Sequence, residues 1–183
     1  MKNIKKFIFL ILAIFILVGC GNMMNTPTKK VEEFLSNYQN QSKEVLDQLD
    51  DVVEDSDTFT ETQKDDYYDL MKKQYKNLTY KIKDETTDGD TATVVVEIEV
   101  IDYGKEIANA ETYLVTNRSE FVSDIEKDVI DTEKFMSYKI DMMSKAKDKV
   151  TYTINFRLTK KDGVWKLNDL SDIDRLKLHG LYY

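Results

Sequence analysis

The sequence predicts an α+β domain in which N-terminal helices pack against an antiparallel sheet and a further helical segment lies between the two main hairpins. Three observations indicate this class. Apolar residues follow helical spacing over residues 27–77. Two strand–turn–strand patterns follow, at residues 78–101 and 150–167. Between them, residues 103–149 return to helical spacing. Helices and antiparallel hairpins that are segregated along a chain are typical of α+β proteins.

The chain begins with a segment typical of an export signal. Three of the first six residues are lysines, and an unbroken apolar run from Phe7 to Val18 follows, ending in Gly19 and Cys20. The run is shorter than the ~20 apolar residues that a membrane-spanning helix needs, so we interpret it as a signal peptide. An uncleaved N-terminal anchor with an incidental cysteine is the alternative.

The tetrapeptide LVGC at residues 17–20 resembles the lipobox of bacterial lipoproteins. This resemblance implies that residues 1–19 are a signal peptide and that Cys20 is lipidated on sulfur, with residues 20–26 as a lipidated tether. The implied acyl groups, such as palmitate, would hold the chain at the extracytoplasmic face of the cell membrane. Two acyl chains anchor stably, whereas one chain is marginal. Because Gly21 rather than Asp follows the cysteine, nothing indicates retention at an inner membrane. The resemblance and the Lys-, Asn- and Asp-rich chain favour a Gram-positive surface.

The charge of the mature chain restricts its partners. The leader contains three of the 26 basic residues and none of the 34 acidic ones, so residues 20–183 have a net charge of −11. An acidic chain argues against nucleic acid as a partner. It also predicts that the lipid on Cys20, rather than a polybasic surface, makes the membrane contact. With the only cysteine committed to lipid, no disulfide is expected.

Residues 27–183 are expected to form a single domain that starts with three helices. Thr26-Pro27 is an N-cap followed by a first-turn proline. Acidic residues crowd the end of the second helix, which is therefore expected to stop near Val53. Thr60 and Gln63 form a capping box for the third helix. The predicted inward stripes are Val31, Phe34, Leu35 and Tyr38; Val45, Leu46, Leu49, Val52 and Val53; and Tyr67, Leu70, Met71 and Tyr75.

The first hairpin is predicted to turn over residues 84–90, around Asp88-Gly89, and the second over residues 160–163. Three helical stripes are expected between the hairpins. A closing helix capped by Ser171 is expected to stop at Gly180. The inward residues predicted for these helices are Ile107, Ala110 and Leu114; Phe121, Val122, Ile125 and Val129; Met136, Ile140 and Met143; and, in the closing helix, Ile173 and Leu176.

Two stretches resemble the nuclear transport factor 2-like fold, a cystatin-like α+β class. The first is the helix start TPTKKVEEFL at residues 26–35, and the second is the hairpin KDGVWKL at residues 161–167. More narrowly, the chain is similar to small uncharacterised lipoproteins of Gram-positive bacteria that carry such a domain. The resemblance covers most of residues 27–170 and implies a curved, cone-like sheet around helices. The helical segment 103–149 is larger than the usual connection of that fold.

No residue set in the sequence indicates catalysis, a cofactor site or a metal site. Enzymes of the resembled fold use an inward carboxylate, and Asp102 and Tyr103 end a strand where such a group could lie; we favour a strand-terminating turn. His179 is interpreted as structural, interacting with a helix C-terminus. The acidic turn 88–90 lacks most of the ligands of a calcium loop.

Arg157 is expected to form a cross-strand ion pair with Glu97 or Glu99. The eleven tyrosines could line a binding groove, but most of those on regular elements fall on predicted core stripes. These are Tyr38, Tyr67, Tyr75, Tyr80 and Tyr152. Trp165 is interpreted as a core residue, and no packing role is predicted for Tyr182-Tyr183.

These features favour a membrane-anchored extracytoplasmic lipoprotein that is not an enzyme and that binds a small ligand or an envelope partner. One alternative is a cone-pocket enzyme of isomerase or hydrolase type. Another is a purely structural or assembly lipoprotein. The space between the sheet and the helices should discriminate between them. An open apolar pocket there favours ligand binding, an open pocket with convergent polar groups favours an enzyme, and a filled space favours protein–protein contacts at an edge or helix face.

Overall fold

The computed structural model describes residues 25–123 and 129–183. The predicted signal peptide, Cys20 and Ile125 lie outside these residues. In chain order the elements are α2 (Pro27–Gln39), α3 (Lys43–Glu54), α4 (Glu61–Asn77), β1 (Thr79–Asp88), β2 (Thr91–Ile101), α5 (Tyr103–Thr116), the short 3-10 helix η1 (Arg118–Phe121), α6 (Thr132–Ser144), β3 (Lys149–Lys161), β4 (Val164–Leu167) and α7 (Asp172–Leu178).

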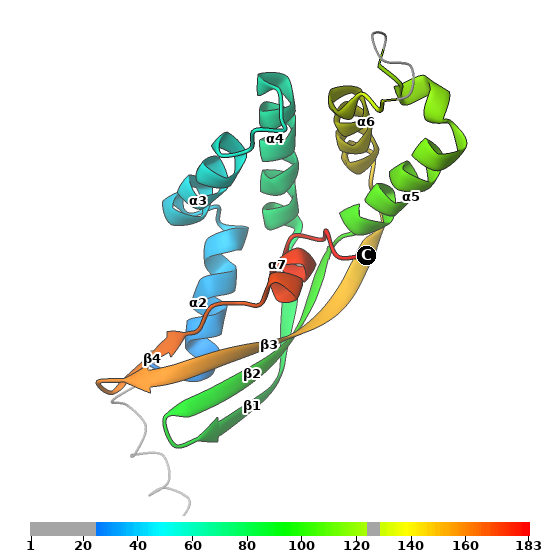
Figure 1. Ribbon diagram of the computed structural model, residues 1–183. Helices are drawn as coiled ribbons and strands as arrows, with labels where there is room; N and C mark the ends of the chain where they lie inside the picture. Colours follow the sequence, from blue (N-terminus) through cyan, green and yellow to red (C-terminus); the bar gives the residue numbers. More distant parts are fainter. Residues whose placement is uncertain (1–24, 124–128) are drawn as a thin grey trace, which may run out of the picture.

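The predicted α+β class is confirmed. Three helices precede a curved antiparallel sheet with strand order β1-β2-β3-β4, and α5 and α6 are inserted between the two hairpins (Figure 1). Although the insertion separates β2 from β3 in the sequence, these strands pair from Thr91 opposite Thr159 to Ile101 opposite Lys149. No helix among the described residues is long and apolar enough to cross a membrane.

Side-chain caps define where the helices begin, as predicted. The Thr26 hydroxyl accepts from the backbone N–H of Lys29, and Pro27 occupies the first turn. Thr60 and Gln63 form the reciprocal capping box of α4, with hydrogen bonds of 3.3 and 3.0 Å. Each cap satisfies a backbone donor that the helix itself leaves unpaired.

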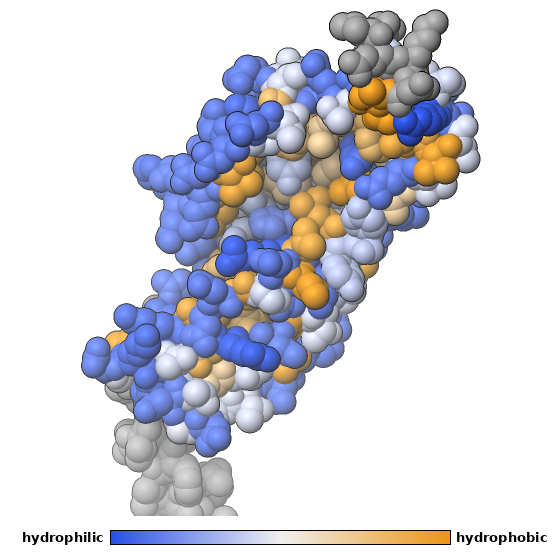
Figure 2. All heavy atoms as spheres, in the orientation of Figure 1, coloured by the Kyte–Doolittle hydropathy of each residue, from blue (hydrophilic) through white to orange (hydrophobic). Residues whose placement is uncertain are grey.

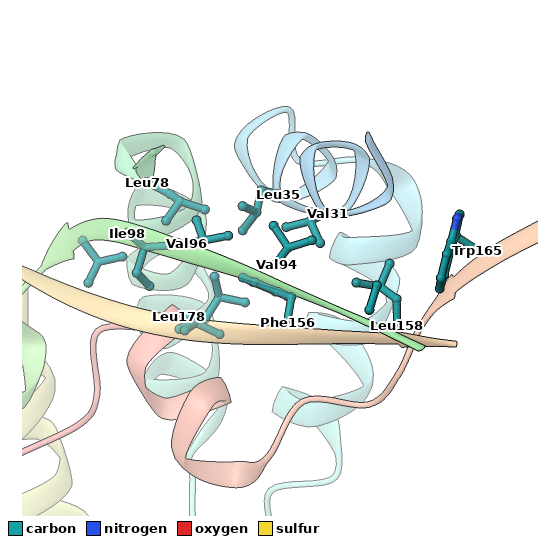
Figure 3. Packing of buried hydrophobic residues seen from close by; sticks show 13 residues of the cluster. Val31, Leu35, Leu78, Val94, Val96, Ile98, Phe156, Leu158, Trp165 and Leu178 are labelled. Carbon is teal, nitrogen blue, oxygen red and sulfur yellow. The ribbon is translucent and has the colours of Figure 1, made fainter. Parts of the chain in front are cut away.

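The first hydrophobic core lies between α2 and one face of the sheet. Figure 3 shows Val31 and Leu35 of α2 beside Val94 of β2 and Phe156 of β3, and all four side chains are fully buried. Trp165 of β4 is buried in the same core, as predicted. This space between helix and sheet is therefore filled.

A second hydrophobic core holds α3, α4, α5 and α6 together. The two cores meet at the end of β2, where Val100 belongs to the first and Ile101 to the second. The buried members of the second core are Val45, Leu49, Val53, Leu70, Met71, Tyr75, Ile101, Tyr103, Ile140, Met143 and Ala146. The insertion between the hairpins thus completes a core that the N-terminal helices begin.

Two predicted connections are wrong. β1 continues through most of the expected turn 84–90 as far as Asp88, because a bulge after Ile82 allows it to keep pairing with β2. The helical stripe expected from Phe121 onward also fails, since Val122 instead forms an isolated antiparallel bridge with Ile130.

Four residues that were predicted to face inward are exposed. Val52 is 65% exposed on α3, Val129 is 49% exposed, and Ile173 and Leu176 of α7 are 53% and 42% exposed. α7 is a helix of seven residues that buries its last residue, Leu178, in the first core. Because only its C-terminal end is docked, its apolar stripe does not face the core.

Candidate functional site

A cleft of about 610 Å³ opens between α2, α3 and α4 on one side and the C-terminal segment 167–181 on the other. Figure 2 shows the molecule hollowed on this face, with hydrophobic side chains gathered along the hollow. Its volume is typical of small-molecule sites. The lining is aromatic (Phe34, Tyr38, Tyr67, Tyr75 and His179), aliphatic (Val45, Leu49, Val52, Met71, Leu167, Leu170 and Leu181) and polar (Gln48, Asn168, Asp169 and Arg175).

Aromatic rings in mutual contact form much of the cleft wall. The ring of Tyr38 lies 5.1 Å from Phe34 and 5.0 Å from Tyr75, measured between centroids, and His179 lies 5.5 Å from Tyr75. α2 supplies two of these rings at i and i+4, and α4 supplies Tyr67 and Tyr75 two turns apart. The same helical spacing that buries the helices therefore places aromatic side chains along one wall.

The tyrosine hydroxyls of this wall are neutral. Burial raises the pKa of Tyr38, Tyr67 and Tyr75 above the ordinary value of a phenol. Within the described part of the chain, none of these hydroxyls forms a hydrogen bond to another residue. The cleft therefore presents phenol groups that can donate hydrogen bonds to a ligand.

His179 lines the cleft at the C-cap of α7. Burial lowers its pKa to about 4, and the nearby charge of Arg175 acts in the same direction. The imidazole is therefore neutral at physiological pH. His179 does lie at the helix C-terminus where it was expected, as the C-cap of α7. Its Nδ1 is buried and has no hydrogen-bond partner among the described residues.

One cation lies among the polar groups of the cleft. The Nε of Arg175 donates to the carbonyl of Leu170 at 3.2 Å. Of the carboxylates that the structure describes, none forms an ion pair with this guanidinium, although Asp169 also lines the cleft. Nothing in the sequence pattern identifies Arg175, because its position depends on how α7 docks.

A buried amide holds the C-terminal wall in place. Gln74 of α4 accepts a hydrogen bond at Oε1 from Ile101 N–H and donates through Nε2 to the carbonyls of Ile101 and His179, each at 2.8 Å. Gly180 follows with φ +69°, and a Cβ there would overlap Gln74 Nε2 and the Ile101 carbonyl. A glycine is therefore required where the chain leaves α7.

The strand end at Asp102 and Tyr103 is structural. Asp102 caps α5 by accepting from the backbone N–H of Lys105, at 3.0 Å. The Tyr103 hydroxyl donates to the buried carbonyl of Leu70 at 3.1 Å. This agrees with the favoured interpretation, a turn that ends the strand. Neither residue lines the cleft.

The ion pair predicted for Arg157 is wrong. The register of β2 and β3 places Arg157 opposite Thr93, while Glu97 and Glu99 lie further along the strand. Glu97 pairs instead with Lys83, and Glu99 with Lys149. The alternation of side chains put these residues on one face, but only the strand register determines which of them meet.

The C-terminal tyrosines have contacts that the sequence did not predict. The Tyr152 hydroxyl donates to the carbonyl of Tyr182 at 2.9 Å, and the Tyr183 hydroxyl donates to a carboxylate oxygen of Glu111 at 3.0 Å.

Among residues 25–123 and 129–183, no group of three or more His, Cys, Asp or Glu side chains could hold a metal ion.

Neither the protein-family models nor the curated proteins that were compared with this chain match it. A solved structure, a putative lipoprotein (ycdA) from Bacillus subtilis, aligns with 93% of the chain at 17% identity and a TM-score of 0.40. The chain spans about half the length of that structure, since 54% of it is covered. A likeness this weak defines neither the family nor the function of the chain.

Proposed function

We propose that this protein is a lipoprotein, anchored through Cys20 at the extracytoplasmic face of a Gram-positive cell membrane, whose domain binds a small, largely apolar ligand in the cleft. The main observation in support is the open cleft of about 610 Å³, whose walls are mostly aromatic and aliphatic. Sites for small molecules are typically concave, apolar and equipped with few polar groups. The anchor rests on the lipobox resemblance at residues 17–20.

The composition of the cleft favours binding over catalysis. In the described chain, His179 Nδ1 makes no hydrogen bond, so it is not oriented by a third group as a general base usually is. The space between α2 and the sheet is filled, which on its own would favour protein–protein contacts. The cleft lies outside that space, between the helices and the C-terminal segment, and it supports ligand binding rather than a purely structural role. The curved sheet with preceding helices supports the further proposal of a distant nuclear transport factor 2-like relationship.

A neutral fluorescent dye tests this function. Nile red should bind the purified chain and become brighter in the apolar cleft. Val52 lies on the cleft rim and is exposed, so Val52→Trp should fold normally, obstruct the opening and weaken binding by about tenfold or more. Val115→Trp, at an exposed position of α5 outside the cleft, is the matched control. Absence of binding, or equal binding by both variants, would reject the proposal.

A further inference from the structure

The charged and polar side chains at the cleft indicate which class of ligand it binds. We infer that the ligand is an amphipathic anion whose apolar body lies against the aromatic wall and whose negatively charged group pairs with Arg175. This inference rests on the proposed function of the cleft. It is carried by two observations: an arginine at the cleft without a carboxylate partner among the described residues, and phenol hydroxyls on the same cleft that form no hydrogen bond to another described residue.

Arg175 is available for a ligand. Its Nε is occupied by the carbonyl of Leu170, which fixes the guanidinium plane and leaves the terminal nitrogens without a hydrogen bond to any described residue. The other cation of α7, Lys177, is paired within the helix, since its Nζ lies 3.6 Å from Asp174. A planar guanidinium presents a fork of donors that matches a carboxylate or phosphate group.

The positive charge of Arg175 acts inside the cleft. It is one of the causes that lower the pKa of His179, and it also acts on the hydroxyl of Tyr38. Two carboxylates oppose it, namely Asp169 on the cleft and Glu44, which acts on Tyr38 in the opposite sense. Neither forms an ion pair with Arg175 within the described chain, so an anion entering the cleft would be its first close partner.

The tyrosines add hydrogen-bond donors to the site. A carboxylate or phosphate oxygen can accept hydrogen bonds from neutral phenols, while the charge of Arg175 is what favours an anion over a cation. Tyr38, Tyr67 and Tyr75 stay protonated because burial raises their pKa. The cleft thus combines an apolar wall for a hydrocarbon or aromatic body with donors for one anionic end.

Competition against bound Nile red at neutral pH tests the inference with three ligands of equal chain length. Dodecanoate and dodecyl phosphate should displace the dye more strongly than dodecanol does. Arg175→Gln should weaken the binding of dodecanoate by about tenfold to a hundredfold, as expected for loss of a charge-assisted hydrogen bond. The same substitution should change the affinity for dodecanol by less than about threefold. Arg175→Lys should recover part of the loss, and Asp169→Asn should strengthen dodecanoate.

Arg157→Gln is the matched control, because it removes an equal charge from an exposed strand position outside the cleft. If dodecanol competes as well as dodecanoate, or if Arg157→Gln acts like Arg175→Gln, the anion inference fails while cleft binding stands. If Nile red binds but none of the ligands displaces it, the inference fails as well. If Nile red itself does not bind, the proposed function fails, and this inference fails with it.

Discussion

At the scale of single residues, His179 has an unusual position for the only histidine of the chain. Its ring contacts Tyr75 and lies 6.1 Å from Tyr38, and its backbone carbonyl accepts from Gln74. Burial of the imidazole disfavours its charged form, and no carboxylate of the described residues pairs with the ring to compensate for the lost hydration. Folding is therefore linked to the protonation of this ring.

The linkage predicts a pH dependence of stability. Above the ordinary histidine pKa of 6.5, the ring is neutral in both states, and its contribution does not change with pH. As pH falls from 6.5 to about 4, the unfolded chain takes up a proton that the folded chain does not, so the free energy of unfolding decreases by about 2–3 kcal/mol.

His179→Phe keeps a ring in contact with Tyr75 but removes the titration. Urea unfolding across this pH range should therefore show the wild-type chain losing stability relative to the variant as pH falls. Comparison of the two chains cancels the titration of the many carboxylates. A constant difference between them at all pH values would contradict a neutral, buried imidazole in the folded state.

At the scale of elements, the C-terminal segment is held less by its own helix than by α4. Ile173 and Leu176 of α7 face solvent, so the short helix contributes little apolar burial beyond Leu178. The three hydrogen bonds of Gln74 instead join α4, the end of β2 and the end of α7. The two hydrogen bonds to Ile101 are buried and the one to His179 is part-buried, so removal of the amide would deprive the Ile101 groups of a partner that water cannot replace.

Gln74→Leu should therefore lower the free energy of unfolding by about 2–4 kcal/mol, because it leaves the buried N–H and carbonyl of Ile101 and the part-buried carbonyl of His179 unpaired. It should also weaken Nile red binding, since the C-terminal wall of the cleft loses its attachment. Gln48→Leu, at an exposed position of α3, is the matched control for stability and should change it by less than about 0.5 kcal/mol. An equal loss of stability in Gln74→Leu and Gln48→Leu would show that Gln74 does not attach the C-terminal segment to α4.

At the scale of the whole molecule, the described chain starts at the β3–β4 hairpin. The Asn25 side chain donates to the carbonyl of Gly163 at 2.8 Å and accepts from the N–H of Trp165 at 3.0 Å. Five peptide steps separate Asn25 from Cys20, which limits their distance to roughly 18 Å. A lipid on Cys20 would hold this hairpin end near the membrane, while the acidic helix α3 and the start of α4 lie toward the other end (Figure 1).

Cys20→Ala should abolish incorporation of radiolabelled palmitate and release the protein from cells, because the two implied acyl chains provide the stable attachment. Labelling followed by fractionation into membranes and medium measures both effects. Gly21→Ala, which keeps the cysteine, should remain labelled and membrane-bound. Incorporation of label into the alanine variant at position 20 would disprove lipidation at this residue.

The local elements of this protein were predictable because short-range chemistry determines them. Capping at Thr26 and Thr60 lies within a few residues of sequence, as does the turn at Asp162-Gly163 with both residues at positive φ. The alternating burial of β2 and β3 is equally local, since successive side chains point to opposite faces. The α+β class follows from the order of these elements.

Tertiary structure alone determined the cleft, the role of its residues and the strand register. His179 meets Tyr38 and Tyr75, and Arg175 reaches the same space, because Gln74 ties the C-terminal segment to α4 and Leu178 docks α7 in the first core. Such contacts join distant parts of the chain, and no local spacing encodes them. Packing between elements therefore determined the position of these cleft side chains. The sequence alone could not predict it, because hydrogen bonds and apolar contacts between distant elements fix each position.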